Sequence, residues 1–327
     1  MGAYLQPSSR GVAGVFSGLT ERLSPLRQQL LKPLIRSRVA LSVAHDQLTL
    51  LTHRTAGGCL ELESWQQVPL PPDLLHMGVP QQPEALGDLI GDLLLQGGIQ
   101  APGATALVPA PAVVLRLLDL PAGLALAGGD AEDLLSWLQP HEAALELPFP
   151  LEQASLNLQP RGSRWLAAFT AQDCLDRWID AVAIAGLELY GLEPEALAVE
   201  RLLPRALADQ PADQWCGCLD LQGPSWQLML WQGDAPQLQC SIDSSNGVEG
   251  LFPYLTESGI LPSPLWLLAD LAEAPPPLER WGEQLGCSLE LLDPLALAQL
   301  RVEGALATPP PAAVDRLVGL ALGRLKP

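Results

Sequence analysis

Two turns in this chain stand where a strand pair could hold a phosphate group. The first turn joins the apolar segments 39–44 and 47–52, and the second joins segments 216–220 and 225–231. In folds that open with such strand pairs, backbone N–H groups of the turn after the first strand can hold a nucleotide phosphate. The candidate residues at these turns are Ser42, Ala44, His45, Asp46, Thr49, Asp220, Gln222 and Ser225.

The residues at these turns are poorly suited to holding a phosphate. Pro224 has no N–H to donate, and Trp226 is too bulky for a turn that must lie close to a phosphate. Phosphoryl-transfer enzymes usually place Lys or Arg and Mg²⁺ ligands against the phosphate, but Lys32 and Lys326 are the only lysines. Neither G-x-x-x-x-G-K-[ST] nor G-x-G-x-x-G occurs. We therefore expect no catalytic residue and no bound cofactor. ATP and Mg²⁺ would bind only under the alternative that the chain is an ATPase.

The cysteines and histidines do not form a metal-site pattern. The six cysteines include no C-x-x-C pair, and the four histidines form no H-x-x-x-H pair. Cys216 and Cys218 lie two residues apart on a strand and so share one face. We interpret them as reduced core residues and expect no metal.

Charge divides the chain into a basic N-terminal segment and an acidic body. Residues 1–38 hold six basic side chains and one acidic one, whereas the remainder holds 12 basic and 36 acidic side chains. An acidic body repels the phosphates whose neutralisation drives nucleic-acid binding. We therefore expect no nucleic-acid partner.

The segment 10–38 also carries an amphipathic helical pattern. Its apolar residues recur at steps of three and four: Phe16, Leu19, Leu23, Leu26, Leu30 and Leu34. Ser24-Pro25 interrupts the pattern and can begin a second short helix. Leucines on one face and basic residues on the other suit an anionic membrane surface. They suit equally well a helix docked on this protein's own acidic body or on a partner.

The order of elements predicts an α/β protein with two lobes. A chain of 327 residues can bury two cores, and each half opens with three strands. No apolar stretch is long enough to span a bilayer, and no secretory signal is evident, so we expect a cytoplasmic protein. Helices are predicted at 83–96, 131–145 with a break at Pro140, 171–185, 194–207, 248–256, 277–285 and 312–325, with a strand hairpin around Arg161-Gly162.

The middle of the chain resembles the type IV pilus assembly protein PilM, an actin-like family related to the cell-division protein FtsA. The resemblance lies in Leu147-Pro-Phe-Pro-Leu-Glu before the hairpin, in the segment from Ala168 to Trp178 that leads into the helix 171–185, and in Ala185-Gly-Leu followed by another helix. Val68-Pro-Leu-Pro71 and the ending Val318-Gly-Leu-Ala-Leu-Gly also fit. Together these motifs cover about residues 39–324.

The resemblance implies an actin-like (ribonuclease H-like) fold with an FtsA-like extra subdomain in the first lobe and a truncated second lobe. Only Asp243 to Leu261 lies where the family carries a further helical subdomain. The implied organisation is a basic extension 1–38, a first lobe core 39–110, an inserted hairpin subdomain 111–192, a return helix and hinge 193–210, and a second lobe 211–327.

The same comparison shows where this chain departs from the family. The first turn of such proteins resembles D-I-G-S-S-S-x-K, but Ser42 stands for the Asp, Ala44 for the Gly and Thr49 for the Lys. At the second turn Asp220 is kept, and Gln222 stands in the Gly position. These losses predict a pseudo-ATPase.

The resemblance implies a scaffold at the inner face of the plasma membrane. Such proteins bind the cytoplasmic tail of a PilN-type membrane protein in a groove between the first subdomain and the hairpin-bearing one, which residues 104–207 would form here, and join the pilus assembly platform. The segment 10–38 would add a membrane contact. An actin-like ATPase of pilus or cell-division type is the alternative, and a GspL-like type II secretion component is a lesser one.

Overall fold

The computed structural model places two similar sheets around a shared helical layer. It describes residues 37–44, 46–109, 112–121, 131–203, 214–221, 225–233, 235–255, 257, 259–269, 276–294, 300–302 and 312–323. Most of the predicted N-terminal extension, residues 1–36, lies outside the described part of the chain. Among the described residues, no helix is long and apolar enough to cross a membrane.

The first sheet has the strand order β10-β6-β1-β2-β3-β16. Its strands β1 to β3 form an antiparallel meander, and β6 and β10 add in parallel beside β1. Gly57 and Gly58, at φ +59° and +77°, make the tight turn from β2 to β3, which needs the left-handed backbone that glycine adopts most easily. The bounds are β1 Arg38–Ala44, β2 Gln47–Ala56, β3 Cys59–Pro69, β6 Gly103–Val108, β10 Glu188–Pro194 and β16 Leu300–Val302.

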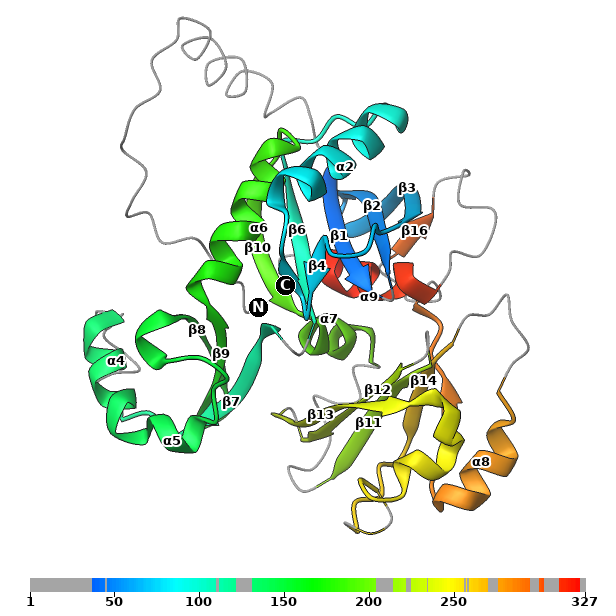
Figure 1. The fold of residues 1–327 in the computed structure, drawn as a ribbon. Coiled ribbons are helices and arrows are strands. Elements are labelled where there is room, and N and C mark those ends of the chain that lie inside the picture. The colour runs from blue at the N-terminus through cyan, green and yellow to red at the C-terminus, as the bar shows by residue number, and fades with distance from the viewer. Residues whose placement is uncertain are drawn as a thin grey trace, which may run out of the picture.

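The second sheet repeats this arrangement in the order β13-β12-β11-β14-β15. Again three antiparallel strands are followed by two parallel ones, so β11 to β15 correspond to β1, β2, β3, β6 and β10 (Figure 1). The duplicated strand meander predicted from the sequence is confirmed. The bounds are β11 Trp215–Asp220, β12 Ser225–Gln232, β13 Ala235–Asp243, β14 Leu265–Leu268 and β15 Leu289–Leu291.

Helices cover the outer face of each sheet and fill the space between the two sheets. Helices α2 (Pro83–Gln96) and α6 (Gln172–Ile184) bury their apolar faces on the outside of the first sheet. Helices α7 (Glu195–Leu202) and α9 (Ala312–Leu322) share one hydrophobic core with residues of both sheets. The short strands β4 (Leu75–His76) and β5 (Val79–Pro80) precede α2.

The inserted hairpin forms a small sheet of its own, in the order β7-β9-β8. Its strands are β7 (Val114–Leu118), β8 (Ala154–Arg161) and β9 (Arg164–Ala171). The hairpin of β8 and β9 forms as predicted, whereas β7 was not part of that prediction. The helix predicted at 131–145 is interrupted at Pro140 as expected, because proline lacks the N–H that a continuous helix needs. The pieces are α4 (Ala131–Leu138), the 3₁₀ helix η2 (Gln139–His141) and α5 (Glu142–Leu145), followed by η3 (Leu151–Gln153).

Two helix predictions in the rest of the chain need correction. The segment expected to be a helix at 248–256 instead begins within a 3₁₀ helix, η5 (Ser244–Leu251), and continues as turns over residues 252–255. Gly247, at φ +56° and ψ −153°, is non-helical and interrupts η5 just before this segment. Pro194, predicted as the first helical residue, ends β10 with an extended backbone, and α7 begins at Glu195. Helix α8 (Leu278–Leu285) forms as predicted on the outer face of the second sheet.

The C-terminal part of the chain returns to the first sheet. Strand β16, which the sequence analysis did not identify, pairs in parallel with β3, and α9 packs on β1 and β2. Pairing with β16 covers the edge of β3, whose backbone groups would otherwise lie open at the side of the sheet. The segment 211–327 was expected to lie in the second lobe, but residues 300–302 and 312–322 lie with the first sheet.

The contact between α7 and α9 is unusually close at one glycine. A Cβ atom added at Gly319 of α9 would overlap the backbone carbonyl of Ala198 of α7. Backbone atoms cannot rotate away as a side chain can, so any larger residue must push the two helices apart.

We expect Gly319→Ala to lower the free energy of unfolding by about 1–3 kcal/mol, the usual cost of overpacking a core. The matched control is Gly91→Ala in α2, where an added Cβ would lie at an ordinary 3.7 Å from the Cα of Ala185. This control should stabilise the protein by roughly 0.5–1 kcal/mol, because alanine favours a helix over glycine. Denaturant unfolding measures both changes. Equal effects of the two substitutions would contradict the close approach.

Candidate functional site

The first candidate turn joins β1 to β2, and its described buried residues carry no charge. Ser42 on β1 lies directly opposite Thr49 on β2, and both side chains are buried. Asp46 lies at the surface with φ +58°, and its carbonyl accepts the Leu70 N–H at 2.7 Å. Ala44 ends β1, whereas His45 lies outside the described residues. The structure therefore brings Ser42 and Thr49 together and leaves Asp46 apart from them at the surface.

The second candidate turn brings one acid deep into the protein. Asp220, the last residue of β11, is 1% exposed. Ser225 begins β12 and is partly buried, while Gln222 and Pro224 lie outside the described residues. An ionised carboxylate at such a depth needs a partner to compensate for its lost hydration. Asp220 has one.

The partner of Asp220 is Arg316 of α9. The Nε of Arg316 lies 2.6 Å from Oδ2 of Asp220, and the arginine itself is only 2% exposed. The Nη1 of the same guanidinium donates to Oε1 of Glu195 at the start of α7. Asp220, Arg316 and Glu195 thus form a buried ion cluster that joins the second sheet to both helices of the central layer.

The neighbours of Arg316 fix its charge. Burial alone would lower the pKa of this guanidinium, because it disfavours the charged form. The two carboxylates and their hydrogen bonds outweigh burial and raise the pKa of Arg316 above its ordinary value. The arginine therefore stays protonated and positively charged inside the cluster.

Helix α7 carries two further ion pairs that lead to other parts of the fold. Arg201 contacts the fully buried Glu193 of β10 and also donates to the Gly319 carbonyl of α9 at 3.3 Å. Arg161, at the end of β8, makes two parallel hydrogen bonds to Glu200, at 2.6 and 2.8 Å. The small inserted sheet, the first sheet and the second sheet are therefore all tied to this one helix.

Sequence reasoning found Asp220 but missed Arg316 and Glu195. The signal was present in the C-terminal helix, where Asp315 and Arg316 interrupt an otherwise apolar run of residues. Charged residues are almost never fully buried unless they are paired, so a charge within an apolar helix indicates a buried partner. Which carboxylate serves as that partner depends on how two distant segments pack.

Three of the six cysteines, Cys174, Cys216 and Cys218, are buried, and the other three are half-buried. Cys216 and Cys218 are both fully buried on the face of β11 that meets the central helices, as their spacing predicted. Burial raises the pKa of the Cys216 thiol to about 12, so it remains protonated at neutral pH. Within the described ranges, no group of three or more His, Cys, Asp or Glu residues is arranged to hold a metal ion.

A cavity of about 210 Å³ lies between the inserted sheet and the second lobe. Residues 113–116 of β7 and the stretch before it line one wall, and residues 236–239 of β13 line another. Ala196 of α7 and Trp231 of β12 also line it. Strands β7 and β13 are each the outermost strand of their sheets, so among the described residues each has one edge without a neighbouring strand.

Solved structures share this arrangement of sheets and helices, although no family model matches the sequence. A chain of the PilM–PilN type IV pilus biogenesis complex superposes with a TM-score of 0.69 at 20% identity, over 89% of this chain and 99% of that one. A Bacteroides thetaiotaomicron protein of unknown function with an actin-like ATPase fold gives a TM-score of 0.50 at 6% identity, over 81% and 93% of the two chains. The chain has an actin-like fold.

This result confirms the α/β actin-like fold and the resemblance to PilM expected from the sequence, at the level of the fold. The cytoplasmic domain of EpsL, an inner-membrane component of the Vibrio cholerae type II secretion system, also matches, with a TM-score of 0.48 at 16% identity over 88% and 94% of the two chains. In this actin-like fold the two candidate turns occupy corresponding places in the two sheets, because β1–β2 and β11–β12 are equivalent hairpins.

The buried ion cluster predicts a specific pattern of stability changes. We expect Arg316→Met to lower the free energy of unfolding by about 3–5 kcal/mol, because it leaves two buried carboxylates without their shared cation. Replacing all three members, with Glu195→Met, Asp220→Leu and Arg316→Met together, should recover at least about 2 kcal/mol of that loss, since none of the cluster's own charges is then left buried. Denaturant unfolding of both variants makes the comparison.

The control is Asp173→Asn, which removes one charge from the surface pair between Asp173 and Arg177. Surface ion pairs contribute little, so this change should cost no more than roughly 0.5 kcal/mol. A triple variant as unstable as Arg316→Met alone would show that the loss came from packing and not from uncompensated charge.

Proposed function

We propose that this protein is a cytoplasmic scaffold of a type IV pilus assembly platform, that it binds the cytoplasmic tail of a PilN-type inner-membrane protein, and that it does so without hydrolysing ATP. The observation that carries the proposal is the superposition of 89% of this chain on 99% of a chain from the PilM–PilN complex. The likeness extends over both lobes and not over one common sheet alone.

The absence of ATP hydrolysis is inferred from what surrounds the two turns. Asp220, the one acid kept from the family pattern, is already held by Arg316 at 2.6 Å. If Asp220 were to take part in nucleotide binding, its buried ion pair with Arg316 would have to break. Breaking such a pair is costly because it leaves a charge uncompensated. Ser42 and Thr49 bring neither the carboxylate nor the ammonium that phosphoryl transfer uses.

The cavity between β7 and β13 is the surface that we assign to the partner tail. Its walls at 113–116 and at Ala196 belong to the segment 104–207 that the PilM resemblance associates with partner binding. Its other walls belong to the second lobe, so this surface differs from the groove between the first subdomain and the hairpin-bearing one that the resemblance implies. An extended peptide can add to an exposed strand edge through main-chain hydrogen bonds while a nearby pocket selects its side chains. Here two such edges lie beside one pocket with apolar walls that include Met229, Trp231 and Leu238.

We expect the purified chain to capture a synthetic peptide with the sequence of the N-terminal cytoplasmic tail of the PilN-type protein encoded in the same genome. Gln237→Trp should weaken this binding at least about tenfold, because an indole placed on the exposed Gln237 of the cavity wall occupies the space that the peptide needs. Fluorescence anisotropy with a labelled peptide measures the affinity.

The control for that substitution is Gln153→Trp, at an exposed glutamine that does not line the cavity. It should bind the peptide as the unmodified chain does. If Gln237→Trp does not weaken capture, the PilN-type partner would still be supported, but this cavity would not be its binding site. A chain that captures neither the tail nor any other pilus component would contradict the scaffold role itself.

We expect calorimetric titration with ATP and Mg²⁺ to give no binding tighter than the high micromolar range, and no phosphate release above the buffer rate. Binding in the low micromolar range, abolished by Asp220→Asn, would instead favour the alternative of an actin-like ATPase. Because tail capture and nucleotide binding are measured separately, either part of the proposal can fail alone.

A further inference from the structure

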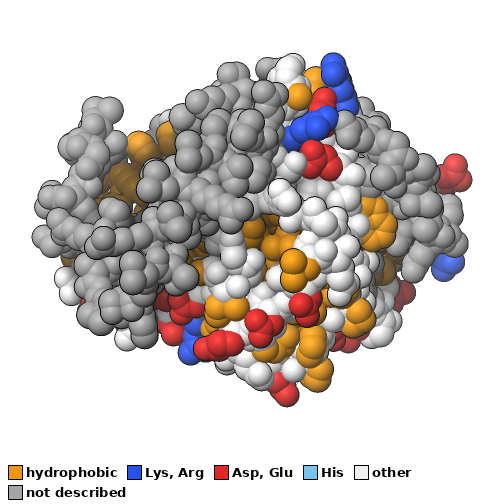
Figure 2. All heavy atoms as spheres, turned by 90° about the horizontal axis from the view of Figure 1, so that it is seen from above, with side chains coloured by type: hydrophobic (Ala, Val, Ile, Leu, Met, Phe, Trp, Pro, Cys, Tyr) orange, Lys and Arg blue, Asp and Glu red, His pale blue; other side chains and the backbone are white. Residues whose placement is uncertain are grey.

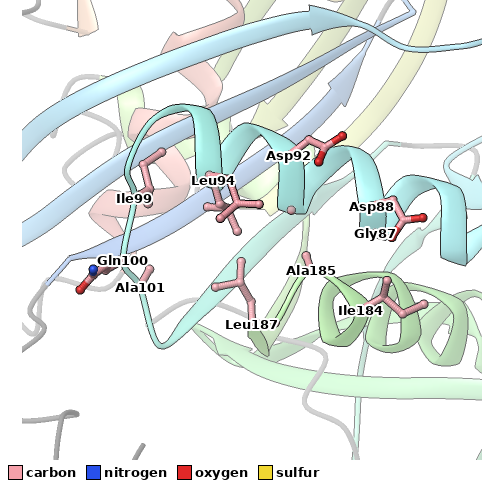
Figure 3. A pocket seen from close by; sticks show the side chains of 13 residues that line it. Gly87, Asp88, Asp92, Leu94, Ile99, Gln100, Ala101, Ile184, Ala185 and Leu187 are labelled. Carbon is pink, nitrogen blue, oxygen red and sulfur yellow. The ribbon is translucent and has the colours of Figure 1, made fainter.

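A groove of about 570 Å³ runs between helices α2 and α6 on the outer face of the first lobe. Its floor is made of small residues, which keep the helices close: an added Cβ at Gly87 would lie 2.6 Å from the Ala181 carbonyl. Leu94, Ile99 and Leu187 line one end of the groove, and Ile184 and Ala185 line the α6 side (Figure 3).

Two large apolar side chains at this groove are turned to solvent. Leu95 is 81% exposed and Ile184 is 44% exposed, although large apolar residues are usually buried. Apolar side chains also lie beside acidic ones on the face of the molecule seen from above in Figure 2. An open groove flanked by exposed leucine and isoleucine is typical of a surface that binds an amphipathic helix.

The charge at the groove favours a basic occupant. Asp88 and Asp92 line it from successive turns of α2, and both are exposed. In the described part of the chain neither carboxylate has an ion-pair partner. A helix with leucines on one face and basic side chains beside them would fill the groove and neutralise both acids.

The chain itself contains such a segment, and the segment joins the fold next to the groove. Strand β1 is parallel to β6, with Val39 opposite Ala104. The groove-lining residues Gln100 and Ala101 come just before β6, so they lie on the order of 10 Å from the start of β1, given about 5 Å between strands and 3.3 Å per residue. Arg38 is held at this end of the sheet, 5.5 Å above the ring of Tyr190.

We infer that the N-terminal segment 16–36 of this chain docks in the groove between α2 and α6. Its leucines at steps of three and four residues contact Leu95 and Ile184, and its basic side chains lie against Asp88 and Asp92. A tethered segment needs little intrinsic affinity, because a short connection gives it an effective concentration in the millimolar range. The inference is independent of the pilus role and of nucleotide binding.

The two lysines of the chain allow a direct test. A carbodiimide joins a lysine ammonium to a nearby carboxylate as an amide with loss of water, and Lys32 is the one lysine in this segment. In the full-length monomer we expect Lys32 to couple to Asp88 or Asp92, as found by mass spectrometry of proteolytic peptides. Because the only other lysine is Lys326, the products can be assigned without ambiguity.

The decisive variant keeps both acids and removes the apolar contacts. Leu95→Ser with Ile184→Ser should reduce the yield of this product about tenfold, since burial of exposed apolar side chains is the proposed source of docking. Both residues are exposed, so the fold should be retained. The control is Leu261→Ser, at a leucine 52% exposed in the second lobe, which should leave the yield unchanged.

Three results would overturn the inference. The first is coupling of Lys32 to acids spread over both lobes, such as Glu283 of α8. The second is an unchanged yield in the double serine variant. The third is the absence of any Lys32 product together with sedimentation on anionic phosphatidylserine vesicles, which would assign the segment to a membrane instead.

Discussion

The structure depends on a charged residue buried between two helices that touch through a glycine. Gly319 lets α9 lie against the Ala198 carbonyl of α7, and one turn away Arg316 reaches acids on α7 and on β11. The apolar contacts of the central layer are non-directional and would tolerate small shifts between the lobes. The buried ion cluster is directional, since a guanidinium meets both carboxylates only in one arrangement, so it fixes how the second sheet sits on the first.

The same cluster limits the chemistry available between the lobes. An acid at the end of β11 can compensate a buried arginine or take part in a nucleotide site, but one carboxylate so deeply buried does not readily do both. Arg316 already engages Asp220 and Glu195, so a nucleotide that used Asp220 would have to break this buried cluster. This arrangement supports the proposal of a scaffold and is independent of any single change in the turns.

Local patterns in the sequence were sufficient to predict most of the fold. The strand pairs, the bounds of α2, the break at Pro140 and the end of α6 before Gly186 all follow from short-range preferences of proline, glycine and alternating apolar residues. The features that were missed depend on distant segments. Strand β16 is three residues long and exists only because the edge of β3 is available, and residues 248–255 form 3₁₀ and turn structure where the local apolar pattern favoured a helix. Arg316 was visible as a charge in an apolar helix, but its partners lie 96 and 121 residues earlier in the chain.

The two surfaces that we assign to peptides lie on different elements and share no lining residue. The cavity is lined by β7, β12, β13 and α7, whereas the groove is lined by α2, the C-terminal end of α6 and the loops that follow these two helices. Sites without shared partners are usually energetically independent, so occupation of one should leave the other open. Coupling between them would have to pass through the rigid first sheet and α7, which the ion pairs of Glu193, Glu195 and Glu200 hold in place. The fold is therefore better suited to holding two segments at once than to exchanging one for the other.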